Sequence, residues 1–293
     1  MGGINTIALT GATGYLGSKL ADAFVKNGYD VVILKRKSSN IKRIKELSEQ
    51  IKMYDYESKG YSKAFEENKI DCVVHTATSY GRRGESMADI YNVNVLLPVA
   101  LLDLCTTHKV KYFINTDTSL PATLNTYALS KSQFAQLLLL CQNSIQSINI
   151  KLEYFYGPGD DDTKFISFLL KNFLSEAPEI DLSDCKQQRD FVYIDDVVAA
   201  YLLLIKRFPA LTGNLEVPLG SGIAYQLSDI VEKTKAAVTS KTRLNFGKLS
   251  MRSGEVMHSV ADTQFLKSLG WNPAFTIDEG IEKTVHIEKS LRA

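Results

Sequence analysis

Short apolar runs alternate with helix-length segments through the first half of the chain. The runs are bounded by turn residues, which predicts strands at 7–9, 31–34, 51–54, 72–76, 112–115 and 148–152. The segments between them have the apolar spacing and the length of helices, and they span 16–27, 61–68, 88–107 and 127–142. This alternation predicts an α/β fold, a doubly wound parallel sheet with helices on both faces.

The pattern changes after about residue 155. A loop at 157–162 leads to a predicted helix at 165–174, and two strands at 190–193 and 215–218 flank a further helix. Shorter helices are predicted at 227–237, 263–269 and 277–289. We therefore expect a dinucleotide-binding domain at 1–156 that is completed by about 190–220. Residues 157–189 and 221–293 would form a smaller α/β substrate-binding lobe.

Composition narrows the function classes. The chain has 293 residues and a formal net charge of +1, which argues against nucleic acid or an anionic membrane as the main partner. No apolar run approaches ~20 residues, so no membrane span is expected. The cysteines and histidines occur singly, without metal-ligand spacing, and predict reduced thiols and no metal site. A cytoplasmic protein is the expectation.

Three glycines follow the first strand, at Gly11, Gly14 and Gly17. Without side chains there, a phosphate group can approach the backbone and the helix can approach its strand. The free N–H groups at the start of that helix favour a diphosphate. The spacing is one residue wider than the usual dinucleotide fingerprint, and a flexible turn is the alternative. With its flanking elements, the stretch predicts a Rossmann-type cofactor site.

The residues after the second strand indicate the type of cofactor. An acidic residue ~20 positions beyond the glycines would bind a free ribose 2′-hydroxyl. Lys35, Arg36 and Lys37 stand there instead, and they would attract a 2′-phosphate, which favours NADP(H). A solvated basic turn is the alternative. Asp55 ends the third strand, where a carboxylate can accept from the adenine amino group or simply occupy a turn.

Tyr127 and Lys131 are spaced i,i+4 on a predicted helix and therefore share a face. An amine beside a phenol stabilises the phenolate and lowers the tyrosine pKa, which suits a general acid. An ordinary surface pair is the alternative. The preceding strand ends at 115–118, where Thr116 and Thr118 supply hydroxyl groups.

In combination these motifs resemble the extended short-chain dehydrogenase/reductase family of NAD(P)-dependent nucleotide-sugar epimerases, dehydratases and reductases. The resemblance extends from Ile7 to the last helix. The residues that carry it are Thr10–Gly17, His75–Thr78, Asn94, Thr116–Thr118, Tyr127 with Lys131, Tyr156–Gly159, Arg189–Asp196, Arg252–Val256 and Leu269–Trp271.

The resemblance implies a role for each matching position. Tyr127, Lys131 and either Thr116 or Thr118 would be catalytic, with Lys131 also on the nicotinamide ribose. Asn94 would help to hold Lys131 through water. Cofactor-binding positions would be Gly11, Thr13, Gly14, Tyr15, Leu16, Gly17, Lys35, Arg36, Asp55, Tyr56, Thr76, Ala77, Thr78, Asn94 and Tyr154. Substrate-binding positions would be Tyr80, Arg82, Asp117, Tyr156, Lys164, Phe165, Arg189, Arg252 and Glu255.

Departures from the family pattern narrow the reaction. The dehydratases of the family have Thr-Asp-Glu at the strand end, and here Thr118 replaces the glutamate. The loop between Thr116 and Tyr127 is short, which leaves open which threonine faces the substrate. Other stretches are similar to the CDP-3,6-dideoxyhexose synthases within the family, among them 78–82, 118–121, 151–157 and 187–191.

The resemblance thus implies NADPH-dependent reduction of the C4 keto group of a nucleotide-linked deoxyhexose. CDP-4-keto-3,6-dideoxyglucose is the favoured substrate, and the product would be a sugar for a surface polysaccharide such as O-antigen. A nucleotide-sugar 4-epimerase and a non-catalytic NADP-binding protein are the alternatives. A homodimer is expected, since the segments 88–107 and 127–142 resemble the helices that pair in relatives.

Overall fold

The computed structural model describes residues 3–56, 60–251 and 254–292. The chain divides into two compact units, each made of two stretches. The first unit comprises Met1–Lys151 and Val198–Val217, and the second comprises Leu152–Val197 and Pro218–Ala293.

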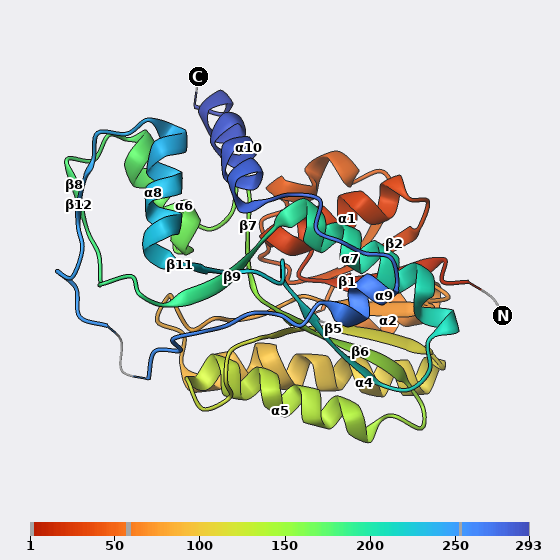
Figure 1. Ribbon diagram of the computed structural model, residues 1–293. Helices are drawn as coiled ribbons and strands as arrows, with labels where there is room; N and C mark the ends of the chain where they lie inside the picture. The colour runs from red at the N-terminus through yellow and green to blue at the C-terminus, as the bar shows by residue number, and fades with distance from the viewer. Residues whose placement is uncertain (1–2, 57–59, 252–253, 293) are drawn as a thin grey trace. The chain divides into compact units, whose positions relative to one another are not determined.

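A seven-stranded sheet forms the frame of the first unit, in the order β10-β6-β5-β4-β1-β2-β3 (Figure 1). Parallel pairing joins β3, β2, β1, β4 and β5. The strands are β1 (Thr6–Thr10), β2 (Asp30–Lys35), β3 (Ile51–Asp55), β4 (Cys72–His75), β5 (Tyr112–Thr118), β6 (Gln146–Leu152) and β10 (Leu215–Leu219). The helices are α1 (Tyr15–Lys26), η1 (Lys42–Leu47), α2 (Gly60–Glu67), α3 (Met87–Tyr91), η3 (Asn92–Leu96), α4 (Leu97–His108), α5 (Thr126–Leu140), α7 (Ile194–Arg207) and η4 (Phe208–Ala210).

Helices cover both faces of this sheet, and α4 and α5 run side by side along one of them (Figure 1). There, Phe134 of α5 and Leu101 of α4 join a buried cluster with Ala8 and Phe113 of the strands. Because successive side chains on a strand alternate in direction, Leu9 points to the opposite face, which α1 covers. This layering confirms the predicted doubly wound α/β fold.

The helical segment Met87–His108 is apolar and long enough to span a membrane by length and composition, contrary to the expectation from sequence. Its hydrophobic residues belong to the protein core, because Leu101, Leu102 and Cys105 are buried in the cluster that packs against the sheet. A core helix meets the same criterion. The segment passes through a π-helical turn, η3, which contains the buried side chain of Asn94.

The second unit contains two small sheets, ordered β11-β9-β7 and β12-β8. In the larger one, β9 pairs in parallel with β7 and antiparallel with β11. Its elements are β7 (Tyr154–Tyr156), α6 (Phe165–Leu174), β8 (Glu179–Asp181), β9 (Gln188–Tyr193), β11 (Ala224–Gln226), α8 (Leu227–Val238), β12 (Arg243–Asn245), α9 (Gln264–Ser268) and α10 (Ile277–Ser290). Asp196, in the first turn of α7, accepts hydrogen bonds from the backbone N–H groups of Ala274 and Phe275 at 2.8 and 3.2 Å. It therefore ties the two stretches of the second unit together, because Asp196 belongs to Leu152–Val197 and its partners to Pro218–Ala293.

Candidate active site

The glycine loop lies between β1 and α1 and is closely packed. A Cβ on Gly11, whose φ is +72°, would lie 2.5 Å from Thr76 Oγ1, and one on Gly17 would lie 2.1 Å from Gly11 O. Gly14 is the N-cap of α1 and provides no side-chain cap. The first N–H groups of α1 therefore have no side-chain acceptor from the N-cap, and they suit an anionic group. These features fit the diphosphate of a dinucleotide.

The other predicted residues of this loop differ in exposure. Thr13 is partly exposed, whereas Tyr15 and Leu16 are buried. Thr76 and Ala77, at the end of β4, contact the same region, because Thr76 Oγ1 donates to Thr10 O at 2.8 Å. This hydrogen bond holds the end of β4 against the end of β1, where the glycine loop begins.

The predicted adenosine-binding residues follow β2 and β3. Lys35 Nζ lies 2.5 Å from Asp55 Oδ1, so this lysine already has a counter-charge. Arg36 is exposed. The Tyr56 ring stacks on that of Tyr61, with centroids 5.2 Å apart and planes 6° from parallel. Of the predicted pair of cations, Arg36 is therefore the better placed to attract a further phosphate.

Arg43 is a cation near this site that the sequence analysis did not select. Its guanidinium carbon lies 5.6 Å from the centroid of the Tyr15 ring, beside the start of α1. It reaches that position because η1 buries Ile44 and Leu47, three residues apart, while Arg43 stays exposed. In the sequence, only the spacing of Ile44 and Leu47 indicates a short helix that would leave Arg43 exposed.

Tyr127 and Lys131 lie one turn apart on α5. The helix begins after Asn125, whose side-chain oxygen accepts from Ala128 N at 2.9 Å. Lys131 is only 1% exposed, and its Nζ has no hydrogen-bond partner within the described ranges. Burial lowers the pKa of Lys131 to about 8, while the charge of Asp117 opposes that shift. A buried ammonium with unused donors fits the ribose hydroxyl groups of a dinucleotide.

The pKa of Tyr127 differs from the sequence expectation. Burial raises it well above 10 and the neighbouring Tyr80 adds to the rise, while a hydrogen bond with Thr118 and the charge of Arg82 lower it. Lys131 was expected to lower the pKa of Tyr127. The desolvation of the phenolate outweighs the nearby charges, so the pKa is raised. The phenol stays protonated at neutral pH, as a proton donor must.

The two candidate threonines have different partners. The Thr118 side chain lies near Tyr127 and lowers the pKa of its phenol, and Thr118 Oγ1 accepts from Leu120 N at 3.3 Å. The hydroxyl of Thr116 lies 2.6 Å from that of Tyr201, a fully buried residue of α7. Tyr201 was not predicted as a polar partner, because it stands in the apolar stretch Ala199–Leu204 and reads as core.

Asn94 occupies the π-helical turn η3 and is fully buried. Its Oδ1 accepts from Ser79 N at 2.8 Å and from Thr78 Oγ1 at 3.2 Å. Its Nδ2 donates to Ser79 O and to Ser130 Oγ, both at 2.9 Å. The expected role was a hold on Lys131 through water. That role stays a prediction, and the direct contacts of Asn94 fasten the loop after β4 to α5.

That loop carries Tyr80 and Arg82, both exposed. The Tyr80 ring lies 4.9 Å from the Tyr127 ring, and the guanidinium carbon of Arg82 lies 5.0 Å from the centroid of Tyr80. Tyr80 is thus beside Tyr127, and Arg82 lies against Tyr80. Asp117, also predicted to bind substrate, is instead only 5% exposed.

The remaining predicted residues belong to the second unit. Arg189 is 3% exposed, and its guanidinium binds Glu255 Oε1 at 2.6 Å, Tyr154 OH at 3.2 Å and Gln188 O at 2.8 Å. The structure thus brings Tyr154, Arg189 and Glu255 together. Tyr154 was predicted to bind cofactor, and its observed partner is Arg189.

The other three described residues of that set have structural contacts. Tyr156 is 3% exposed, and its hydroxyl donates to Ile277 O at 3.3 Å. Lys164, the N-cap of α6, lies 3.1 Å from Asp160 Oδ2, and Phe165 begins that helix. Arg252 lies outside the described residues. Nowhere in the described ranges do three metal-ligating side chains gather.

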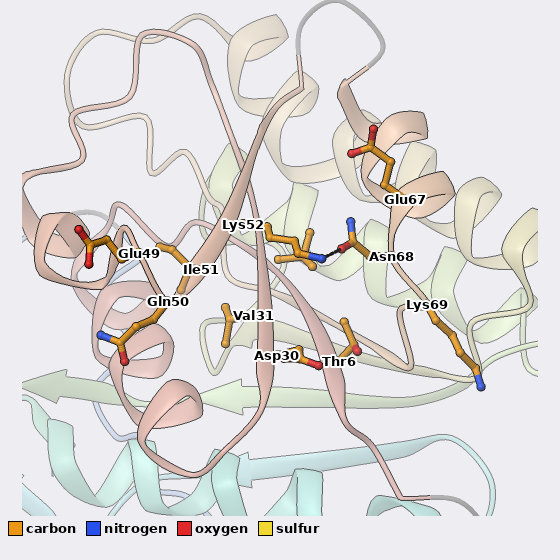
Figure 2. A pocket seen from close by; sticks show the side chains of 11 residues that line it. Thr6, Asp30, Val31, Glu49, Gln50, Ile51, Lys52, Glu67, Asn68 and Lys69 are labelled. Carbon is orange, nitrogen blue, oxygen red and sulfur yellow. Dashed lines mark hydrogen bonds between the residues drawn. The ribbon is translucent and has the colours of Figure 1, made fainter.

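A cavity of about 350 Å³ opens at the other ends of the strands, next to Thr6, Asp30 and Ile51, the first residues of β1, β2 and β3 (Figure 2). Within it, Lys52 Nζ donates to Asn68 Oδ1 at 2.8 Å (Figure 2). Ligands of parallel sheets bind beyond the carboxyl ends of the strands. We therefore do not assign this cavity to the site.

Comparisons with known proteins agree with the geometry. Residues 7–215 match the NAD dependent epimerase/dehydratase family. The chain is 34% identical over 293 residues to the CDP-abequose synthase of Salmonella muenchen, a match that covers 97% of this chain and 98% of that protein. It is 29% identical over 291 residues to the CDP-abequose synthase of Salmonella typhimurium, covering 94% and 96%.

Solved structures share the fold. A UDP-glucose 4-epimerase from Thermotoga maritima, solved with UDP-glucose, matches with a TM-score of 0.86 at 21% identity, covering 98% of this chain and 100% of that chain. MoeE5, solved with UDP-glucose and NAD, matches with a TM-score of 0.86 at 22% identity, covering 99% and 100%.

Proposed function

Because the chain belongs to the NAD dependent epimerase/dehydratase family, we propose that it is an NADPH-dependent nucleotide-sugar 4-ketoreductase. Its substrate would be a nucleotide-linked 4-keto-deoxyhexose, with CDP-4-keto-3,6-dideoxyglucose favoured. The observation that carries this proposal is the pairing of Tyr127 with Thr118, a hydroxyl residue at the position of the dehydratase glutamate. Similarity to the two Salmonella CDP-abequose synthases over nearly the full length supports the sugar class.

The side chains around Tyr127 suit proton donation to a carbonyl oxygen. Reduced nicotinamide, when bound, supplies the hydride that the C4 carbon accepts. Tyr127 donates its phenolic proton to the C4 oxygen as the negative charge develops there. Thr118 is the third member of the Thr/Tyr/Lys set, and its hydroxyl donates a hydrogen bond that steadies the phenolate left behind. Lys131 binds the ribose and adds a positive charge nearby.

A dehydratase is disfavoured by the groups at the end of β5. Elimination on the hexose needs an acid and a base at the strand end. Thr118 cannot serve as either near neutral pH, and Asp117 is buried with both of its oxygens accepting hydrogen bonds. The protein would therefore act on a ketone that another enzyme has made.

The second candidate is a 4-epimerase, which the fold of the UDP-glucose 4-epimerase from Thermotoga maritima favours. Cofactor choice separates the two, because an epimerase retains NAD and returns the hydride, whereas a reductase consumes NADPH. Arg36 and Arg43 support NADPH, since both are exposed cations near the expected ribose phosphate. A non-catalytic NADP-binding protein is the third candidate, and the retained Tyr127 and Lys131 argue against it.

The remaining parts of the proposal concern substrate binding, assembly and location. Arg189 would bind the nucleotide diphosphate, with Glu255 near the sugar or base, and Tyr80 would pack on the deoxygenated face of the sugar. Leu96 of η3 and Leu140 of α5 are 59% and 78% exposed, which supports a homodimer through these helices. A reductase that consumes NADPH suits the cytoplasm.

Substrate identity is tested by a comparison of two ketones. The protein and NADPH are mixed with CDP-4-keto-3,6-dideoxyglucose or with its 3-hydroxy counterpart, and the products are identified by NMR. We expect preference for the 3-deoxy compound, because a 3-hydroxyl packed against an aromatic ring would be desolvated without a partner. Equal rates on both ketones would contradict the 3-deoxy assignment, and lack of reduction of either would contradict the ketoreductase.

A further inference from the structure

Three polar side chains form a buried chain on β5 and β6 beneath α5. Asn115 Nδ2 donates to Asn149 Oδ1 at 2.7 Å, and Asn149 Nδ2 donates to Asp117 Oδ2 at 2.9 Å. The other carboxylate oxygen, Asp117 Oδ1, accepts from Thr118 N at 2.8 Å. All three side chains are less than 9% exposed. Asp117 therefore has a hydrogen-bond donor on each of its two oxygens.

The direction of the two hydrogen bonds at Asp117 suits the negatively charged form of its carboxyl group. Both neighbours of Asp117 are N–H donors, so a carboxylate satisfies them and a protonated oxygen facing one of them would not. Asn149 uses both ends of its amide, because its Oδ1 accepts from Asn115 and its Nδ2 donates to Asp117. Asn149 thus offers an N–H donor to Asp117, which suits a negatively charged carboxylate.

A buried cation lies on the helix that covers this chain. Lys131 is 1% exposed and without a hydrogen-bond partner in the described part of the structure, so its charge depends on a nearby opposite charge. Asp117 on β5 is the group that favours its charged form. On β4, His75 is fully buried with Nδ1 2.8 Å from Thr10 Oγ1. On α5 itself the neighbour is Tyr127.

We propose that Asn149 is a positioning residue that holds Asp117 as a fixed counter-charge, which keeps Lys131 cationic for binding to the cofactor ribose. This inference rests on the proposed function for the cofactor but not on the identity of the sugar. It also explains why the aspartate of the family triplet is retained although the dehydratase glutamate is not. Asp117 acts here through its charge and not as an acid.

The titration behaviour of the neighbours supports this assignment. Burial lowers the pKa of Lys131 to about 8, and Asp117 opposes that shift. Burial and the charge of Lys131 lower the pKa of His75 well below 6.5, so the histidine is neutral and adds no competing charge. Burial, with Tyr80 and Asp117, raises the pKa of Tyr127, so the phenol is neutral as well. Without Asp117, Lys131 would lose its proton closer to neutral pH.

The first experiment measures the dissociation constant of NADPH by fluorescence from about pH 6.5 to about pH 9.5. In the unmodified protein we expect affinity to fall as Lys131 deprotonates. Asp117→Asn should move that fall to lower pH by about one unit, which corresponds to ~10-fold weaker binding on the alkaline side. Asn149→Leu should also move the fall in affinity to lower pH, but by less than one unit. In this variant the Asp117 carboxylate remains but loses one hydrogen-bond donor.

Asn214→Leu is the matched control. Asn214 Oδ1 accepts from Ser147 N and Ser147 Oγ on β6 at 2.8 and 2.9 Å, so this variant also removes a side-chain amide that hydrogen-bonds β6. We expect no change in the pH at which affinity falls. If Asn149→Leu weakens NADPH by the same factor at every pH, as a purely structural defect would, the proposal is wrong.

A second readout needs no cofactor. The free energy of unfolding is measured by urea at several pH values and compared with that of Lys131→Met. Since the pKa of Lys131 is lowered to about 8 in the folded protein and is about 10.4 when unfolded, the unfolded state binds more protons between these values. Stability relative to Lys131→Met should therefore rise with pH through that window. In Asp117→Asn and Asn149→Leu backgrounds the rise should begin at lower pH.

The two readouts separate two kinds of failure. If the unmodified protein binds no nicotinamide dinucleotide, the proposed function fails while the unfolding measurement still reports the charge of Lys131. If the pH window of stability is the same in the Asp117→Asn and unmodified backgrounds, the counter-charge proposal fails whatever the cofactor does.

Discussion

The hydroxyl oxygens of Thr116 and Tyr201 lie 2.6 Å apart in the interior of the first unit. Tyr201 has no exposed surface, so Thr116 is its hydrogen-bond partner in a buried environment. Thr118, two residues further along β5, lies near Tyr127 instead and lowers the pKa of its phenol. From this division of partners we propose a structural role for Thr116 and the catalytic role for Thr118.

Valine substitutions at these two positions should have opposite effects. Thr118→Val should lower kcat by ~10²-fold with little loss of stability, because it removes a donor to the developing phenolate. Thr116→Val should leave kcat within a few-fold but lower the free energy of unfolding by ~1–3 kcal/mol, since the Tyr201 hydroxyl would be buried without a partner. Steady-state kinetics and urea unfolding measure both. Tyr201→Phe combined with Thr116→Val should recover part of the stability, and a reversed pattern would return the catalytic role to Thr116.

Tyr127→Phe tests the proton donor. The variant keeps the ring that packs against Tyr80 and loses only the hydroxyl, so NADPH affinity should be nearly unchanged. Turnover should fall by ~10²-fold or more. Single-turnover reduction measures the rate of turnover, and NADPH titration measures the affinity for the cofactor. Lys131→Ala is the comparison, because it should weaken both turnover and cofactor binding. Near-normal turnover by Tyr127→Phe would remove the acid role from this residue.

Cofactor preference should depend on Arg36 and Arg43. Arg36→Ala and Arg43→Ala should each weaken NADPH by ~10-fold, which is about 1.4 kcal/mol, and leave NADH binding unchanged. Lys35→Met is the matched control, and a smaller effect is expected because Asp55 already neutralises that amine at 2.5 Å. The measurement is the dissociation constant of each variant for NADPH and for NADH, determined by fluorescence. Equal affinity of the unmodified protein for NADPH and NADH would contradict the assignment.

Gly17→Ala tests the glycine loop. The added methyl would lie 2.1 Å from Gly11 O, a backbone atom, so the loop must shift away from α1. We expect loss of detectable dinucleotide binding and a lower melting temperature. Gly28→Ala, at a position with φ +80° and open space, is the control for strain without a clash. It should lower stability and leave dinucleotide affinity intact. Retained binding by Gly17→Ala would contradict the packing argument.

The elements of the sheet could be predicted because each strand is a compact apolar run between turn residues. The three-residue strands β7, β8, β11 and β12 were missed, because so few residues carry no periodicity and their pairing depends on distant partners. The glycine loop and the Tyr127–Lys131 pair have local spacing, so they could be selected from the sequence as candidates. Their electrostatics could not be predicted, since burial around Tyr127 depends on residues far apart in sequence.

The choice between Thr116 and Thr118 depended on a residue 85 positions away. Tyr201 stands among alanines and leucines, and nothing in its neighbours indicates that its hydroxyl meets β5. Asn149 is similar, because its contact with Asp117 crosses from β6 to β5 and is 32 residues long in sequence. Local patterns predict elements and motifs, whereas partners across strands come from the tertiary structure.

The most direct test of the reductase assignment is the stoichiometry between NADPH and sugar. A limiting amount of CDP-4-keto-3,6-dideoxyglucose is added to the protein with excess NADPH, and the loss of NADPH absorbance is compared with the alcohol formed, measured by NMR. The account predicts one NADPH oxidised for each 4-hydroxy sugar produced. Interconversion of 4-epimeric nucleotide sugars without net oxidation of NADPH would contradict it and identify the protein as an epimerase.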